Sequence, residues 1–171
     1  ATEEVIGKIA LGDKDDVAIF NDTRDEKIKN SSGGGFVTSE IAESENSYKV
    51  KIITLDYFFK DKNFQNDTSI FIKIDLEGYD FKAINGAKSI ILNNDCSVIF
   101  EFSKMIMSQK DYSIKDIDFF LQRGFKLYDM YGNQMSTKDL EAKIYELDDG
   151  HDTCGNIILS KKKLDFNFHN K

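Results

Sequence analysis

SIFIKIDLEGYD, residues 69–80, carries the strongest fold signal in this 171-residue chain. It begins as a nearly continuous apolar run and ends in a cluster of carboxylates around a glycine. A run of this kind, bounded by polar residues, predicts a strand buried on both faces, which is typical of a parallel sheet covered by helices. Open α/β sheets bind their ligands at the carboxyl ends of their strands. A functional site is therefore expected at the acidic end of this stretch.

The segments around residues 69–80 alternate between strand and helix patterns. Apolar residues recur every three or four positions over residues 81–91, which predicts a helix, and Gly86 within it favours a break. Strands are predicted at 5–11, 17–20, 48–52, 97–103, 125–130 and 156–160, a long polar loop at 21–46, and helices opening at Ser113 and spanning 137–146. The alternation predicts an α/β fold with a mostly parallel sheet and helices on both faces.

Length and composition predict a single domain over residues 1–171, with short strands and a loop in 1–68, αβ units in 69–160 and a tail in 161–171. The net charge of −7 argues against nucleic acid as the main partner, because phosphate contacts need clustered Lys and Arg. No apolar run is long enough for a membrane helix and no signal pattern opens the chain, so a cytoplasmic protein is expected. Cys96 and Cys154 are too few for a disulfide scaffold or a zinc cage.

Several segments together resemble one protein family. The central piece is FIKIDLEGYD (71–80) followed by INGA (84–87), and around it stand, in order, ALGD (10–13), TLD (54–56), VIFE (98–101) and GNIIL (155–159). These pieces resemble the FkbM-type S-adenosylmethionine-dependent methyltransferases. The resemblance covers residues 9–159 and implies a class I, Rossmann-like sheet with S-adenosylmethionine as cofactor. It implies methylation of a hydroxyl on a sugar or another small metabolite.

The chain departs from that family at its beginning. Such methyltransferases open with a strand, a glycine-rich loop that cradles the cofactor, and a second strand whose acid binds the ribose. Here the third-strand region is already reached at Ile9, and the glycines of SSGGG (31–35) follow a polar segment and precede no helix pattern. We therefore expect an N-terminally truncated domain with an incomplete cofactor site and weak cofactor binding. A non-catalytic fragment that keeps the scaffold is the alternative from another class.

Asp75, Glu77 and Glu101 are the candidate catalytic residues. If the strands at 69–74 and 97–103 are parallel neighbours, their carboxyl ends lie about 5 Å apart, which brings these acids to one rim of the sheet. Methyl transfer to oxygen is mainly a matter of positioning, and a carboxylate can accept the proton of the hydroxyl. Two other interpretations stay open. The acids could cap the next helices, or they could bind a metal ion in a different Rossmann-like transferase.

Two further residues complete the predicted site. His151 lies in a polar loop before the last strand, from which it could reach the rim and act as a base. The family resemblance places Asp13 near the adenine of the cofactor and adds Asp75 to the cofactor contacts.

The resemblance also predicts an unusual sheet edge. Class I methyltransferases place their first two strands beside the strand that carries Asp75, and without them residues 70–74 would expose unpaired backbone groups. Because such an edge is a template for pairing with another chain, we expect it to be filled. Either the chain's own residues 5–20 fill it, or a second copy does in a symmetric homodimer.

Overall fold

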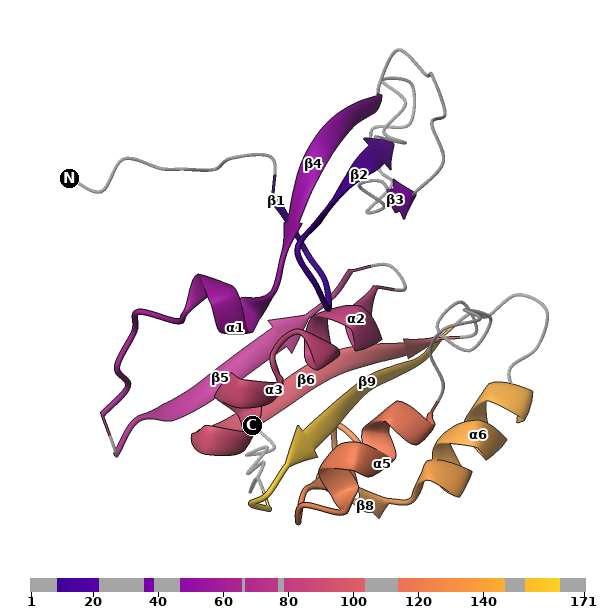
Figure 1. Ribbon diagram of the computed structural model, residues 1–171. Coiled ribbons are helices and arrows are strands. Elements are labelled where there is room, and N and C mark those ends of the chain that lie inside the picture. The colour runs from indigo at the N-terminus through magenta and orange to yellow at the C-terminus, as the bar shows by residue number, and fades with distance from the viewer. Residues whose placement is uncertain are drawn as a thin grey trace, which may run out of the picture.

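The computed structural model describes residues 9–21, 36–38, 47–65, 67–76, 79–103, 114–146 and 153–163. These residues form two β-sheets and a set of short helices. Figure 1 shows the smaller sheet standing on the larger one, with α1 (Leu55–Phe58) and α2 (Asp80–Asn85) near the place where the two sheets meet.

The smaller sheet contains four strands in the order β1-β4-β2-β3. Its strands are β1 (Ile9–Leu11), β2 (Asp16–Asn21), β3 (Phe36–Thr38) and β4 (Ser47–Ile53). β1 runs parallel to β4, whereas β2 is antiparallel to both β3 and β4. The prediction of an uninterrupted loop over residues 21–46 is wrong, because β2 extends to Asn21 and β3 lies within that range.

The larger sheet contains five strands in the order β5-β6-β9-β7-β8. They are β5 (Ser69–Ile74), β6 (Asp95–Ser103), β7 (Lys126–Tyr128), β8 (Gln134–Met135) and β9 (Thr153–Ser160). β5 and β6 pair in parallel, as the predicted site requires, and the pairs β6–β9, β7–β9 and β7–β8 are antiparallel.

The α/β class is therefore right, but the prediction of a mostly parallel sheet is wrong. Among the described strand pairs, only β1–β4 and β5–β6 are parallel. β9 inserts between β6 and β7 and runs antiparallel to both of them. The alternation of strands and helices does not predict this, because a strand's direction depends on where the chain re-enters the sheet and not on its own residues.

β5 lies at one edge of the larger sheet. The prediction that it is buried on both faces is also wrong, because one of its faces is exposed. Within the described residues β6 is its only partner, and Phe71 is 59% exposed on the face away from the core. β1 and β2 pair with β4 and not with β5, so the described part of residues 5–20 does not fill this edge.

One face of the larger sheet carries the main core. Val98, Phe100 and Phe102 alternate along β6, and the register places Val98 opposite Leu159 and Phe100 opposite Ile157 of β9. The helices that cover this face are α2, α3 (Lys88–Asn93), α5 (Lys115–Leu121) and α6 (Thr137–Glu146). The opposite face holds a small cluster of Ile99, Tyr128, Ile158 and Met130, to which no described helix contributes. The described helices thus cover one face, where two were expected.

The two sheets meet at a tightly packed contact that we call the junction, formed by Gly12, Thr54, Asp56 and Gly86. A Cβ atom on Gly86 would collide with the carbonyl oxygen of Gly12, so the β1–β2 turn can approach α2 only because residue 86 is glycine. The backbone N–H of Asp56 donates to the carbonyl of Gly86 at 2.9 Å. Its carboxylate accepts from the N–H groups of Ser89 and Ile90 at 2.8 and 2.9 Å, which caps α3 from a distant part of the chain.

Several local predictions are confirmed. The helix pattern over residues 81–91 breaks at Gly86, since α2 ends at Asn85 and α3 begins at Lys88. The predicted helix at 137–146 is α6 with the same bounds. The helix expected to open at Ser113 begins at Lys115, and the expected strand over 125–130 is shorter in β7.

Candidate functional site

The parallel pairing of β5 and β6 brings two of the predicted acids to one rim. The register ends with Ile74 opposite Phe100, and Asp75 and Glu101 are the next residues of their respective strands. The prediction that the strands carrying these two acids are parallel neighbours is confirmed, although β6 continues past Glu101 to Ser103. Their roles in catalysis stay predictions.

Asp75 is accessible at this rim. Its Oδ2 atom lies 3.0 Å from Nζ of Lys73, and the two side chains are 60% and 44% exposed. The same Lys73 ammonium donates to the carbonyl of Ile74 at 3.3 Å. An ion pair this exposed contributes at most about 1 kcal/mol to stability. Asp75 is therefore oriented by Lys73 but remains available to a ligand.

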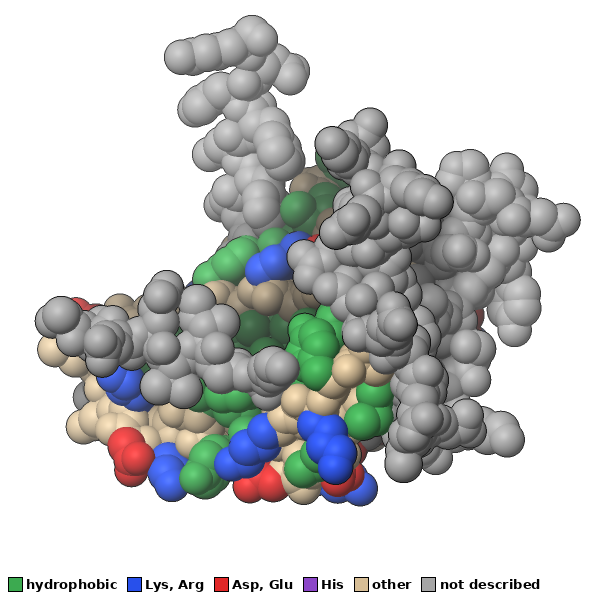
Figure 2. Space-filling model, turned by 90° about the horizontal axis from the view of Figure 1, so that it is seen from above, with side chains coloured by type: hydrophobic (Ala, Val, Ile, Leu, Met, Phe, Trp, Pro, Cys, Tyr) green, Lys and Arg blue, Asp and Glu red, His purple; other side chains and the backbone are tan. Residues whose placement is uncertain are grey.

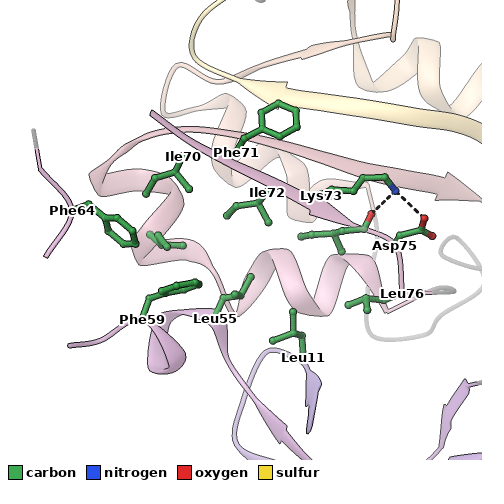
Figure 3. A pocket seen from close by; sticks show the side chains of 12 residues that line it. Leu11, Leu55, Phe59, Phe64, Ile70, Phe71, Ile72, Lys73, Asp75 and Leu76 are labelled. Atoms are coloured by element: carbon green, nitrogen blue, oxygen red, sulfur yellow. Dashed lines mark hydrogen bonds and ion pairs between the residues drawn. The ribbon is translucent and has the colours of Figure 1, made fainter. Parts of the chain in front are cut away.

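An elongated cavity of about 440 Å³ runs along β5 and reaches Asp75. Its walls are mainly apolar and come from β1, α1, the segment after α1, β5 and α3, including Leu11, Leu55, Phe59, Phe64, Ile72 and Ile90. Figure 3 shows Phe59 and Phe64 near one end, and Leu76 and Asp75 near the other, where Lys73 reaches towards Asp75. A mainly apolar cavity with a few polar groups at one end is the usual form of a small-molecule site.

Asp80 is a buried acid at the rim that the sequence analysis did not single out. It is completely buried at the start of α2, where its Oδ2 accepts from the N–H of Leu76 and its Oδ1 from the N–H of Glu101, both at 3.3 Å. Burial raises the pKa of the Asp80 carboxyl, and the negative charge of Asp75 raises it further. The N–H groups of Glu101, of Leu76 and of Asp80 itself act in the opposite direction.

A signal for Asp80 was present in the sequence, because an acid that directly precedes an apolar helix face is a candidate for backbone contacts. The sequence did not reveal that one of those contacts comes from the segment after β5 and the other from β6. The cavity walls Phe59 and Phe64, which precede β5 in the chain, were not predicted as part of the site.

The other predicted site residues do not all lie in the described part of the rim. Glu77 and His151 lie outside the residues that the structure describes. Asp13 is exposed on the β1–β2 turn, two residues after the cavity wall Leu11. Glu101 is half-buried, and at this rim the backbone N–H groups of Leu76 and Glu101 are bound by Asp80.

Metal ligands do not gather in the part of the chain that the structure describes, where no three His, Cys, Asp or Glu residues form a group able to hold an ion. Burial raises the pKa of the Cys96 thiol to about 12, which keeps it protonated and unreactive. Figure 2 shows the surface from above, with Lys, Arg, Asp and Glu side chains intermixed along one border and hydrophobic side chains between them.

The chain was also compared with known proteins. A family model described as the methyltransferase FkbM domain matches residues 3–127. This range includes the junction, β5, the rim and α5, whereas α6 and β9 follow it. Neither a curated protein nor a solved structure matches the chain. None of the described helices is long and apolar enough to span a membrane.

Proposed function

Because the chain belongs to the FkbM methyltransferase family, we propose that it transfers a methyl group from S-adenosylmethionine to a hydroxyl of a sugar or another small metabolite. The observation that carries the proposal is the rim, where Asp75 is exposed at the end of the cavity beside β5 and Glu101 lies near the carboxyl end of the neighbouring strand β6. The family match supports the reaction class, the hydroxyl substrate is what the resemblance to this family implies, and the acids of the rim are compatible with it.

The cavity fits part of the cofactor. Its volume of about 440 Å³ and its apolar walls suit a flat or aliphatic group, and the exposed Asp75 carboxylate suits hydroxyl donors. We assign Asp75 and Asp13 as cofactor contacts, with Leu11 and Ile72 as apolar walls. S-adenosylmethionine supplies an electrophilic methyl group on a sulfonium when it is bound.

The acids of the rim would orient the acceptor and take up its proton. In an O-methylation the hydroxyl oxygen forms a bond to the methyl carbon, the carbon–sulfur bond breaks and the sulfur keeps the electron pair. The proton of the hydroxyl must leave, and a carboxylate within hydrogen-bond reach can accept it. Asp75 and Glu101 are the described candidates for this role, and Glu77 and His151 are candidates outside the described residues.

The test is a methyl-transfer assay with methyl-labelled S-adenosylmethionine and a panel of sugars and small hydroxylated metabolites. We expect labelled methyl ethers from at least one class of hydroxyl compound. Label recovered only on amines or thiols would overturn O-methylation while leaving methyl transfer intact.

Calorimetric titration of S-adenosylmethionine tests cofactor binding separately. We expect measurable binding, because the cavity beside β5 supplies apolar walls and Asp75 supplies an exposed carboxylate. No binding at millimolar concentration together with no labelled product would favour the non-catalytic scaffold.

A further inference from the structure

Asp80 occupies a position at which an acid is costly. The residue is completely buried, and among the described residues no Lys or Arg forms an ion pair with it. A buried carboxylate loses its hydration, and hydrogen bonds or an opposite charge must replace it. Here the replacement comes from backbone N–H groups, so the contacts of Asp80 must explain why an acid is present.

The two main contacts of Asp80 join separate strands. Oδ2 accepts from Leu76, the second residue after β5, and Oδ1 accepts from Glu101 within β6. Asp80 itself begins α2, so one side chain ties the ends of two strands to the start of the helix between them. Capping of α2 does not explain this arrangement, because the N-cap residue is Tyr79 and neither Leu76 nor Glu101 belongs to the helix.

We propose that Asp80 is a positioning residue of the rim, whose carboxylate fixes the end of β5 against β6 and so sets how the side chains of Asp75 and Glu101 stand relative to each other. This proposal rests on the proposed function only in treating the rim as the reacting site. We call the two contacts of the Asp80 carboxylate, with the N–H groups of Leu76 and Glu101, the clamp. The clamp is a property of the folded chain and can be measured without a substrate.

The chemistry of the clamp requires a carboxylate. Both of its oxygens accept, one from the segment directly after β5 and the other from β6. An asparagine offers one acceptor oxygen, and its amide nitrogen would face an N–H donor with a donor of its own. Asp80→Asn therefore keeps the shape of the side chain but breaks one of the two links.

Among the described residues, Asp75 is the ionisable group whose charge acts on Asp80. Asp75 follows β5 and raises the pKa of Asp80 by its charge, and Glu101 of β6 donates its backbone N–H. Protonation of Asp80 removes part of its acceptor capacity, so the two backbone contacts should weaken together when the pH falls. This common response distinguishes a clamp from two unrelated contacts.

The test is a pH titration of the full chain by ¹⁵N–¹H NMR, combined with amide hydrogen exchange. We expect the amide resonances of Leu76 and Glu101 to titrate with one shared midpoint above the ordinary range of aspartate. Asp80→Asn should abolish this shared titration. It should also speed exchange of one of these two amides, the one that faces the asparagine nitrogen, by about tenfold, the size expected for one lost hydrogen bond, and exchange at Ile72 and Val98 should change much less.

Asp56→Asn is the matched control, because Asp56 also accepts two backbone N–H groups. It should shift the amide resonances of Ser89 and Ile90 and leave the titration of Leu76 and Glu101 in place.

Independent midpoints for Leu76 and Glu101 in the unmodified chain would overturn the proposal, even if Asp80→Asn fails to fold. Faster exchange at all four reporter amides in Asp80→Asn would show general destabilisation and would also overturn it. A shared titration in a chain that neither binds S-adenosylmethionine nor transfers methyl would leave the clamp standing and refute the proposed function.

Discussion

The junction and the rim both lie within the range that the family model matches, yet they differ in how their polar groups are used. At the junction, Gly86 leaves no room for a side chain against Gly12, and both oxygens of the Asp56 carboxylate bind backbone N–H groups. At the rim, Asp75 is exposed beside an open cavity and contacts only a half-exposed lysine among the partners described. Gly86 and Asp56 therefore stabilise the contact between the two sheets, whereas Asp75 is accessible to a ligand.

The largest expected effect is at the junction, for Gly86→Ala. The added Cβ must displace the backbone of Gly12, so we expect a loss of about 3 kcal/mol in the free energy of unfolding, at the upper end for an overpacked site. Urea denaturation measures it. Ser89→Ala, at an exposed position of α3, is the control and should stay within about 0.5 kcal/mol of the unmodified chain. Equal stability of the two variants would mean that the sheets can separate slightly without cost.

At the rim, we expect Asp75→Ala to lower methyl-transfer turnover by about a hundredfold, because the exposed carboxylate would position or deprotonate the acceptor. The unfolding midpoint should change little, since only an exposed ion pair is lost. Turnover and thermal unfolding are measured on the same samples, with Glu141→Gln on α6 as the control. Near-normal turnover with a clear loss of stability would reverse the assignment and make Asp75 an architectural residue like Asp56.

Asp56→Ala should lower the free energy of unfolding by about 2 kcal/mol, because two N–H groups at the start of α3 lose their acceptor. Urea denaturation gives the value, and Asp61→Ala on the exposed segment after α1 is the control. An effect of Asp56→Ala no larger than that of Asp61→Ala would show that water replaces the carboxylate at no cost.

The edge of β5 should recruit a second copy of the chain, because its outer side has no strand partner within the described residues and Phe71 is exposed beside it. We expect light scattering to give twice the mass of the chain at high concentration. Phe71→Lys should weaken this association, and Tyr131→Lys, at an exposed site on another loop, should not. A monodisperse monomer with fast amide exchange along β5 would show that the free edge is tolerated.

The smallest expected effect is the pH dependence contributed by Asp80. Its pKa is raised in the folded chain, so ionisation opposes folding, and stability is lost as the pH rises from the unfolded value of 3.8 through the folded pKa. The unmodified chain should therefore gain stability relative to Asp80→Asn when the pH is lowered through this window. Urea denaturation at several pH values measures the difference, and a difference that is constant with pH would contradict the raised pKa.

Much of the candidate site could be predicted because its signals are local. The break at Gly86, the bounds of α6 and the pairing of the strands before Asp75 and Glu101 all follow from periodicity, a glycine and a connecting helix. The double contact of Asp80 could not be predicted in this way, because one of its two partners lies 21 residues away in the chain.

The elements between residues 69 and 103, the family and the parallel pairing of the strands that carry Asp75 and Glu101 follow from sequence, because side-chain periodicity and short motifs act within a few residues. The antiparallel course of β9 between β6 and β7, the edge position of β5 and the backbone contacts of Asp56 and Asp80 are visible only in the folded chain. An apolar strand has the same pattern at an edge as in the middle of a sheet. Its neighbours, its direction and its exposed face are set by chain segments far away in the sequence, and so are the partners of a buried acid.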